Sequence, residues 1–147
     1  GLMRRYEEAL ARADINAALQ ALRARAEVQG KVGSLGYCMG GRLAYLTAAT
    51  TDVDAAVAYY GGGIQNLLAL AGAVHCPLQL HYAEIDDSIP LTAVQSVRQA
   101  LPQADLHLYN GARHGFNCWA RAAYHAPSAA LAHGRSLAFL AHTLAGA

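Results

Sequence analysis

A thiol, a carboxylate and an imidazole occur in the order Cys38, Asp86, His114 along this chain of 147 residues. Together these groups can do nucleophilic chemistry: the sulfur attacks a carbonyl, the imidazole moves its proton, and the carboxylate orients the imidazole. Each residue alone is a weak signal, because most cysteines and histidines of proteins are packing or surface residues. The interpretation therefore depends on the elements that must position them.

Cys38 lies in residues 36–41, Gly-Tyr-Cys-Met-Gly-Gly, between a short apolar run and a helical stretch of small residues. This pattern predicts a sharp strand-to-helix turn with the cysteine at its tip. Gly36 and Gly40 are expected to relieve crowding across the turn. The helix N-terminus would favour the thiolate, and the backbone N–H of Met39 would be an oxyanion donor.

Apolar runs typical of strands alternate with helical patterns along the chain. The alternation predicts about four parallel strands with helices on both faces, an α/β fold, and residues 1–147 show no linker, which predicts a single domain. Residues 2–28 predict two helical pieces, the second capped by Asp14, and Ser128 is expected to cap the last helix. The expected strands are 31–37, 55–60, 77–82 and 106–109, and the expected helices between them are 39–50, 64–71 and 91–101.

The three candidate residues follow three different predicted strands. Right-handed crossovers place the carboxyl ends of parallel strands at one edge of the sheet, where ligands of such folds bind. We therefore expect Cys38, Asp86 and His114 to meet at this edge. Asp87 is a rival for the acid, because either carboxylate of the loop could face the histidine.

Composition narrows the possible partners. Charged residues make up 14% of the chain, the net charge is +1, and the Lys and Arg residues are scattered, which disfavours nucleic acid as a partner. Apolar runs are shorter than a membrane span and no signal-peptide pattern opens the chain, so a cytoplasmic protein is predicted. The three cysteines lack metal-ligand spacing, which predicts no metal site. Cys76 and Cys118 are interpreted as packing residues.

Four segments together resemble the dienelactone hydrolase (carboxymethylenebutenolidase) family of the α/β-hydrolase superfamily: residues 36–41, 59–61, 86–90 and 114–116. In that family the acid lies four residues before a proline, which selects Asp86, and the histidine heads a His-(Gly/Ser)-Phe motif, which selects His114. The resemblance implies a hydrolase that cleaves small esters or lactones through a Cys-His-Asp triad and a thioester acyl-enzyme, without a cofactor. It also implies substrates that carry a carboxylate, for which the candidate partners are Arg42, Arg113 and Arg121.

The chain departs from the family before Cys38. Members of that family have an eight-stranded sheet with several strands ahead of the nucleophile. In this chain only helical sequence precedes the nucleophile. We therefore expect a partial α/β-hydrolase, the C-terminal, catalytic part, without the loop that supplies the second oxyanion donor. Its first strand would have an unpaired edge, which a homodimer could cover.

Other functions stay open. The chain could be a non-catalytic or truncated binding module with a hydrolase fold, or a redox-sensitive thiol protein, since an exposed thiolate is readily oxidised. Glutamine amidotransferases also use a cysteine after a strand, but a carboxylate follows their histidine by two residues, where this chain has Phe116.

Overall fold

A computed structural model describes residues 7–145. Its sheet contains four parallel strands in the order β1-β2-β3-β4, namely β1 (Gly33–Tyr37), β2 (Ala55–Tyr59), β3 (Leu78–Ile85) and β4 (Asp105–Arg113). The helices of this part of the chain are α1 (Glu8–Arg23), α2 (Met39–Thr50), the 3-10 helices η2 (Ile64–Asn66) and η3 (Leu68–Ala73), α3 (Leu91–Ala100) and α4 (Ala126–Leu144).

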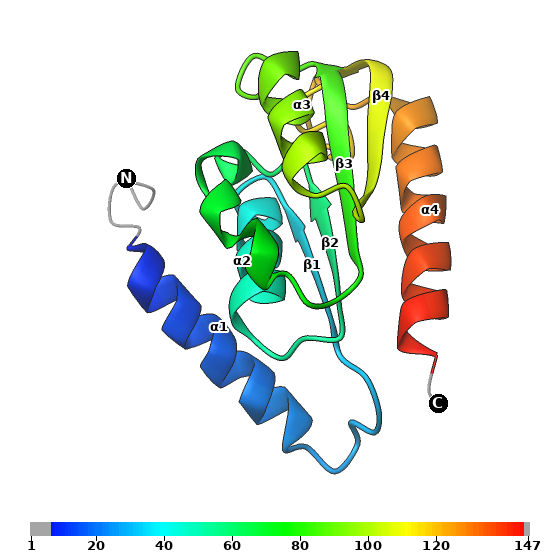
Figure 1. The fold of residues 1–147 in the computed structure, drawn as a ribbon. Coiled ribbons are helices and arrows are strands. Elements are labelled where there is room, and N and C mark those ends of the chain that lie inside the picture. The colour runs from blue at the N-terminus through cyan, green and yellow to red at the C-terminus, as the bar shows by residue number, and fades with distance from the viewer. Residues whose placement is uncertain (1–6, 146–147) are drawn as a thin grey trace.

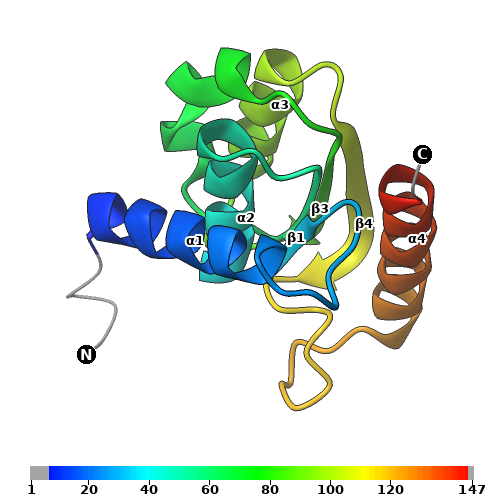
Figure 2. The same ribbon diagram turned by 90° about the horizontal axis from the view of Figure 1, so that it is seen from below.

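The helices lie on both sides of the sheet, as the alternating pattern predicts. Figures 1 and 2 show α1, α2 and α3 on one side and α4 alone across the other. Helix α2 packs against β1 and β2, and α4 contacts β2, β3 and β4. Because β2 is covered on both faces, all five of its residues are buried, which explains its continuous apolar sequence.

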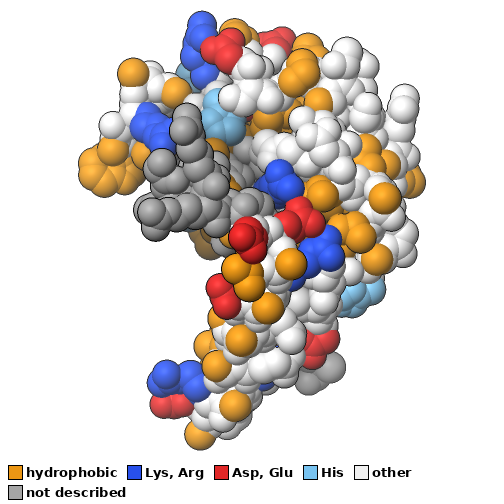
Figure 3. Space-filling view, turned by 90° about the vertical axis from the view of Figure 1, so that its left-hand side faces the viewer, with side chains coloured by type: hydrophobic (Ala, Val, Ile, Leu, Met, Phe, Trp, Pro, Cys, Tyr) orange, Lys and Arg blue, Asp and Glu red, His pale blue; other side chains and the backbone are white. Residues whose placement is uncertain are grey.

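Strand β1 forms one edge of the sheet and pairs with β2 alone among the described residues. An apolar groove of about 420 Å³ runs beside it between α1 and α2. On the side that carries α1, acidic, basic and hydrophobic side chains alternate over the surface (Figure 3). None of the described helices is both long and apolar enough to cross a membrane. The expected edge is confirmed, while a homodimer remains a prediction.

The structure corrects both predicted helix caps. Asp14 lies inside the continuous helix α1, because the surrounding alanines sustain the helix through that position. Helix α4 begins at Ala126 with His125 at its N-cap, and Pro127 occupies its first turn, a position that proline favours. Ser128 lies within that turn, where its hydroxyl is 2.7 Å from Nδ1 of His125. Leu2, the first residue of the predicted helical stretch, lies outside the described residues.

Other boundaries also differ from the predictions. The stretch 64–71 forms two 3-10 helices, and β3 and β4 extend beyond their apolar runs to Ile85 and Arg113. In the extension, Ala83 pairs with Tyr109 and Ile85 with Arg113, with a register shift between them. This extension carries Asp86 and His114 to the same edge.

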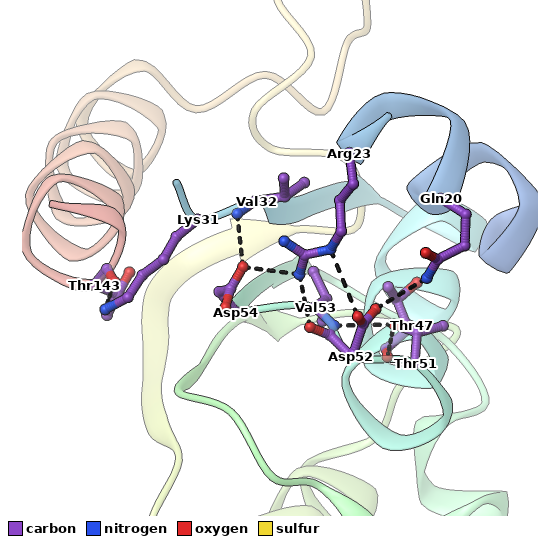
Figure 4. Close-up of polar contacts among 10 residues, drawn as sticks. All are labelled: Gln20, Arg23, Lys31, Val32, Thr47, Thr51, Asp52, Val53, Asp54 and Thr143. Atoms are coloured by element: carbon purple, nitrogen blue, oxygen red, sulfur yellow. Dashed lines mark hydrogen bonds and ion pairs between the residues drawn. The ribbon is translucent and has the colours of Figure 1, made fainter. Parts of the chain in front are cut away.

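Asp54 joins the end of α1 to the start of the sheet (Figure 4). Its Oδ2 accepts hydrogen bonds from the backbone N–H of Val32 at 2.7 Å and from Nη2 of Arg23 at 2.9 Å. Arg23 also donates to the carbonyl of Asp52 at 2.8 Å. Burial by itself would raise the pKa of Asp54, but the two hydrogen bonds hold this pKa below its ordinary value. The carboxylate of Asp54 therefore links the last turn of α1 to the residue before β1.

Asp54→Ala is expected to lower the free energy of unfolding by about 1–3 kcal/mol, because it leaves Val32 N–H and Arg23 without their charged acceptor. Urea denaturation at neutral pH measures the loss. Asp52→Ala is the control: its carboxylate is 63% exposed, so its ion pair with Arg23 is worth less than about 1 kcal/mol. Since the pKa of Asp54 is lowered on folding, its contribution is present above about pH 4 and disappears as pH falls through the folded pKa. Equal losses in both variants would contradict this account of α1.

A buried network of hydrogen bonds joins α4 to strands β2, β3 and β4. His81 is fully buried, with Nδ1 2.8 Å from the hydroxyl of Tyr109 and Nε2 2.9 Å from both Gln79 Oε1 and Ser136 Oγ. Ser136 lies on α4, and its Oγ is also 2.7 Å from the hydroxyl of Tyr59. Burial lowers the pKa of His81 to about 3, so the ring is neutral in the folded protein near pH 7.

The neutral His81 predicts a loss of stability in acid. The unfolded chain binds a proton at this histidine below about pH 6.5, whereas the folded chain does so only near its own pKa of about 3. Between these values His81 is expected to lower the free energy of unfolding by up to about 1.4 kcal/mol per pH unit as pH falls. An NMR titration of the His81 ring measures this directly. Conversion of the ring to its charged form near pH 6.5 in the folded protein would contradict the prediction.

Candidate active site

Cys38 occupies the turn between β1 and α2 in a backbone conformation that side chains rarely adopt. Its φ is 56° and its ψ is −116°. Hydrogen bonds hold the turn on both sides: Cys38 N–H donates to the carbonyl of Tyr59 at 3.0 Å, and the N–H groups of Gly41 and Arg42 donate to the carbonyl of Cys38 at 3.0 and 3.2 Å. Such strain persists only where the surroundings enforce it, and it is concentrated at functional sites.

Two glycines permit the tight turn. A Cβ at Gly36 would lie 1.9 Å from the carbonyl oxygen of Gly40, and a Cβ at Gly41 would lie 2.5 Å from the carbonyl oxygen of Tyr59. A Cβ at Gly40 would meet nothing within 4 Å. The expectation for Gly36 is confirmed. The expectation for Gly40 is wrong, because its carbonyl rather than its missing side chain makes the close approach.

The structure brings the three predicted residues together, each directly after its strand. Nε2 of His114 is 3.2 Å from Sγ of Cys38, and Nδ1 of His114 is 2.8 Å from Oδ2 of Asp86. In the tautomer whose Nδ1–H donates to the carboxylate, the unprotonated Nε2 faces the sulfur. The arrangement can transfer the thiol proton to the imidazole.

Asp86 is fixed independently of the histidine. Its side chain is fully buried, and its Oδ1 accepts hydrogen bonds from the N–H groups of Ser88 at 2.8 Å and Ile89 at 3.1 Å. The rival Asp87 is exposed. Of the two carboxylates, Asp86 is therefore the one that contacts His114.

A small cavity of about 200 Å³ lies over the sulfur. Its walls are formed by Tyr37, Cys38, Tyr60, Gly115, Cys118 and Arg121. Arg121 is thus the one of the three candidate arginines that lines this cavity. Arg42 instead donates to Oε2 of Glu8 at 2.8 Å. Arg113 and Arg121 are both exposed, but Arg113 does not line the cavity.

From the sequence, Cys118 is expected to be a packing residue, and no role is expected for Tyr37 or Tyr60. Cys118 instead forms part of the wall of the cavity, on the loop after His114. Tyr60 has a φ of 35°, and its ring centroid is 5.1 Å from that of His114. Residues 59–61 are among the segments that resemble the family, but that resemblance assigns Tyr60 no role.

Residues 2–144 match the sequence profile of the dienelactone hydrolase family. The chain belongs to this family. It is 39% identical over 131 residues to the carboxymethylenebutenolidase of Pseudomonas putida. The match covers 87% of this chain and 56% of that protein. A crystal structure from Klebsiella pneumoniae, named for the same family, is 32% identical with a TM-score of 0.81, covering 88% of this chain and 60% of that one.

More distant structures share the fold. A dienelactone hydrolase-like promiscuous phosphotriesterase from metagenomic libraries superposes with a TM-score of 0.79 at 22% identity, covering 93% of this chain and 63% of that one. The α/β-hydrolase fold and the resemblance to the dienelactone hydrolase family are both confirmed. The chain spans about half the length of the curated relatives that it matches.

Within residues 7–145, no three His, Cys, Asp or Glu side chains converge in a way that could hold a metal ion. The site instead combines a thiol in contact with an imidazole, Cys38 with His114, and an arginine, Arg121, that lines the cavity beside Cys38. They suit reactions at a carbonyl carbon next to a negative charge.

Proposed function

We propose that this protein hydrolyses small esters or lactones, with Cys38 as nucleophile, His114 as general acid and base, and Asp86 as the residue that orients His114. The observation that carries the proposal is the continuous chain of contacts from sulfur to imidazole to buried carboxylate, at 3.2 and 2.8 Å, on the wall of a cavity. Membership of the dienelactone hydrolase family gives the reaction class.

In the first half of the reaction, Nε2 of His114 takes the proton of Cys38 while Sγ forms a bond to the carbonyl carbon. The carbonyl oxygen becomes an oxyanion, which accepts a hydrogen bond from the backbone N–H of Met39, the first residue of α2. When the intermediate collapses, the bond to the alcohol oxygen breaks and His114 returns the proton to that oxygen. A thioester remains on Cys38.

In the second half, His114 removes a proton from a water molecule that attacks the thioester carbonyl. The carbon–sulfur bond breaks, the carboxylic acid leaves, and His114 returns its proton to the sulfur at the N-terminus of α2, which restores the starting state. The positive end of the helix dipole stabilises the negative charge that the sulfur carries while His114 holds its proton. Asp86 stabilises the imidazolium formed in each half.

Arg121 gives the cavity a preference for anionic substrates. Arg121 lines the same small space as Cys38, and planar guanidinium groups bind carboxylates through paired hydrogen bonds. We therefore propose esters or lactones that carry a carboxylate close to the reacting carbonyl. A cytoplasmic location, a single domain, the absence of nucleic acid partners and a homodimer remain predictions.

Trapping of the acyl-enzyme tests the proposed function. The full chain is mixed with 4-nitrophenyl acetate, quenched in acid at short times, and digested for peptide mass spectrometry. The proposal predicts an acetyl group on the peptide that contains Cys38, formed much more slowly in His114→Ala. An acetyl group found equally on the peptides of Cys76 and Cys118, or on none of the three, would contradict it.

One observation favours the redox-sensitive alternative. Cys118 lines the same cavity as Cys38, so a sulfenic acid formed on Cys38 by hydrogen peroxide has a second thiol nearby. Attack by Cys118 on that sulfur would form a disulfide and release water. Peptide mapping after peroxide treatment decides this alternative: a peptide pair linked through Cys38 and Cys118 would support it, and over-oxidised Cys38 alone would oppose it.

A further inference from the structure

A second hollow adjoins the cavity over the sulfur. It has a volume of about 370 Å³ and is lined by Tyr37, Tyr60, Asn117, Cys118 and Trp119. Tyr37, Tyr60 and Cys118 line both spaces, so the hollow continues directly from the nucleophile cavity. A molecule that reacts at Cys38 can therefore extend into it.

Aromatic rings dominate the walls of this hollow. Trp119 is 83% exposed and Tyr37 is 40% exposed, so both offer large apolar faces that the fold leaves uncovered. The rings of Tyr37 and Tyr60 are 6.4 Å apart. Exposed aromatic faces beside a reactive group are typical of binding sites for flat apolar groups, because each ring offers a large area with few rotatable bonds.

The walls are held in place by backbone geometry. Cys118 N–H donates to the carbonyl of Gly115 at 2.9 Å, and Arg121 N–H donates to the carbonyl of Cys118 at 3.0 Å, so consecutive turns position Trp119 between them. Tyr60, with its positive φ, donates its N–H to the carbonyl of His81 at 2.7 Å. Tyr60 lines the hollow, and its ring centroid is 5.1 Å from that of His114.

We propose that this hollow is a subsite for the aromatic ring of an aryl ester, with Trp119 as its outer wall. The inference rests on the proposed function and deepens it, because it names the substrate class that the site prefers. The ring packs against Tyr37, Tyr60 and Trp119, while the ester carbonyl lies over Cys38. Arg121 lies in the neighbouring cavity, within reach of an anionic substituent.

The chain provides its own probe, because Trp119 is its single tryptophan. In a Cys38→Ala chain, which cannot react, phenylacetate is expected to shift the tryptophan emission to shorter wavelength in a saturable way as the ring covers the indole. Cyclohexylacetate matches phenylacetate in size and charge without a flat π face. It is expected to bind about 2- to 10-fold more weakly.

Selectivity supplies a second readout in the reactive chain. The substrates here are two acetate esters, one of phenol and one of methanol. Trp119→Ala is expected to lower the ratio of kcat/KM for the phenyl ester to that for the methyl ester by about 3- to 10-fold. Tyr124→Ala is the matched control. Tyr124 is an exposed aromatic residue of the same segment that lines neither space, so the ratio should not change.

The outcomes separate the subsite from the reaction. An emission shift without ester hydrolysis would support the subsite and refute the proposed function. Hydrolysis with no emission shift, and with the same selectivity in Trp119→Ala as in Tyr124→Ala, would overturn the subsite alone. Equal binding of phenylacetate and cyclohexylacetate would also overturn it, because the aromatic walls would then add nothing specific. If Trp119→Ala does not fold, the emission measurement still decides, since it uses the intact wall.

Discussion

Cys38→Ala is expected to lower kcat/KM for 4-nitrophenyl acetate by at least about a thousandfold. The substitution removes the sulfur that would form the thioester. This sulfur is the one that lies 3.2 Å from Nε2 of His114. Removing the nucleophile of a catalytic triad eliminates nearly all of its catalysis. Substrate binding and oxyanion stabilisation leave a small residual rate. Steady-state hydrolysis of the ester measures the loss.

Cys76→Ala is the control for this prediction. Cys76 packs partly buried against the hydrophobic core, away from the cavity, and burial raises the pKa of its thiol. Its removal is expected to leave the rate unchanged. A Cys38→Ala chain that retained a tenth or more of the activity would show that hydrolysis occurs elsewhere on the protein.

Gly36→Ala is expected to lower the free energy of unfolding by about 3 kcal/mol or more. Its Cβ would lie 1.9 Å from the carbonyl oxygen of Gly40, and neither backbone can retreat without moving β1 against α2. Urea denaturation measures the change. Because the turn also positions Cys38, any Gly36→Ala protein that folds should react more slowly with esters as well.

Gly40→Ala is the matched control, because it adds the same methyl group on the other side of the turn. A Cβ there meets nothing within 4 Å, and the residue lies in the first turn of α2. Alanine is a better helix former than glycine, so the variant should be as stable as the wild type or up to about 1 kcal/mol more stable. Similar losses in both variants would contradict the account of the turn.

The elements that the sequence predicted well are those that tertiary contacts do not alter. Helix α2 was expected over 39–50 and spans those residues, because glycine punctuates its start and small apolar residues fill it. Strand β2 reads as apolar throughout because both of its faces are covered. Strands β3 and β4 were predicted too short, because their ends are largely exposed and are held by contacts between the two strands: Gly111 N–H donates to Oε2 of Glu84 at 2.7 Å. No periodicity within one segment reveals such pairing.

The residues of the candidate site also differ in how well the sequence predicts their positions. Cys38, Asp86 and His114 could be placed from the sequence because each directly follows a strand, and parallel strands end at one edge. Trp119 and Arg121 lie on the irregular segment between β4 and α4, where no pattern says which side chains face the sulfur. Asp14 was misplaced for the opposite reason: a residue with cap chemistry lies inside a helix that its alanine-rich neighbours sustain.

The most direct test of the central claim, a thiolate activated by His114, is the rate of Cys38 alkylation by iodoacetamide as a function of pH. Mass spectrometry resolves the three cysteines in the wild-type chain and in His114→Ala, and Cys76 is the internal reference because burial raises its pKa. The account predicts rapid labelling of Cys38 below pH 7, slow labelling of Cys76, and loss of the Cys38 advantage in His114→Ala. Labelling of Cys38 no faster than that of an ordinary free thiol, and unchanged in His114→Ala, would contradict it.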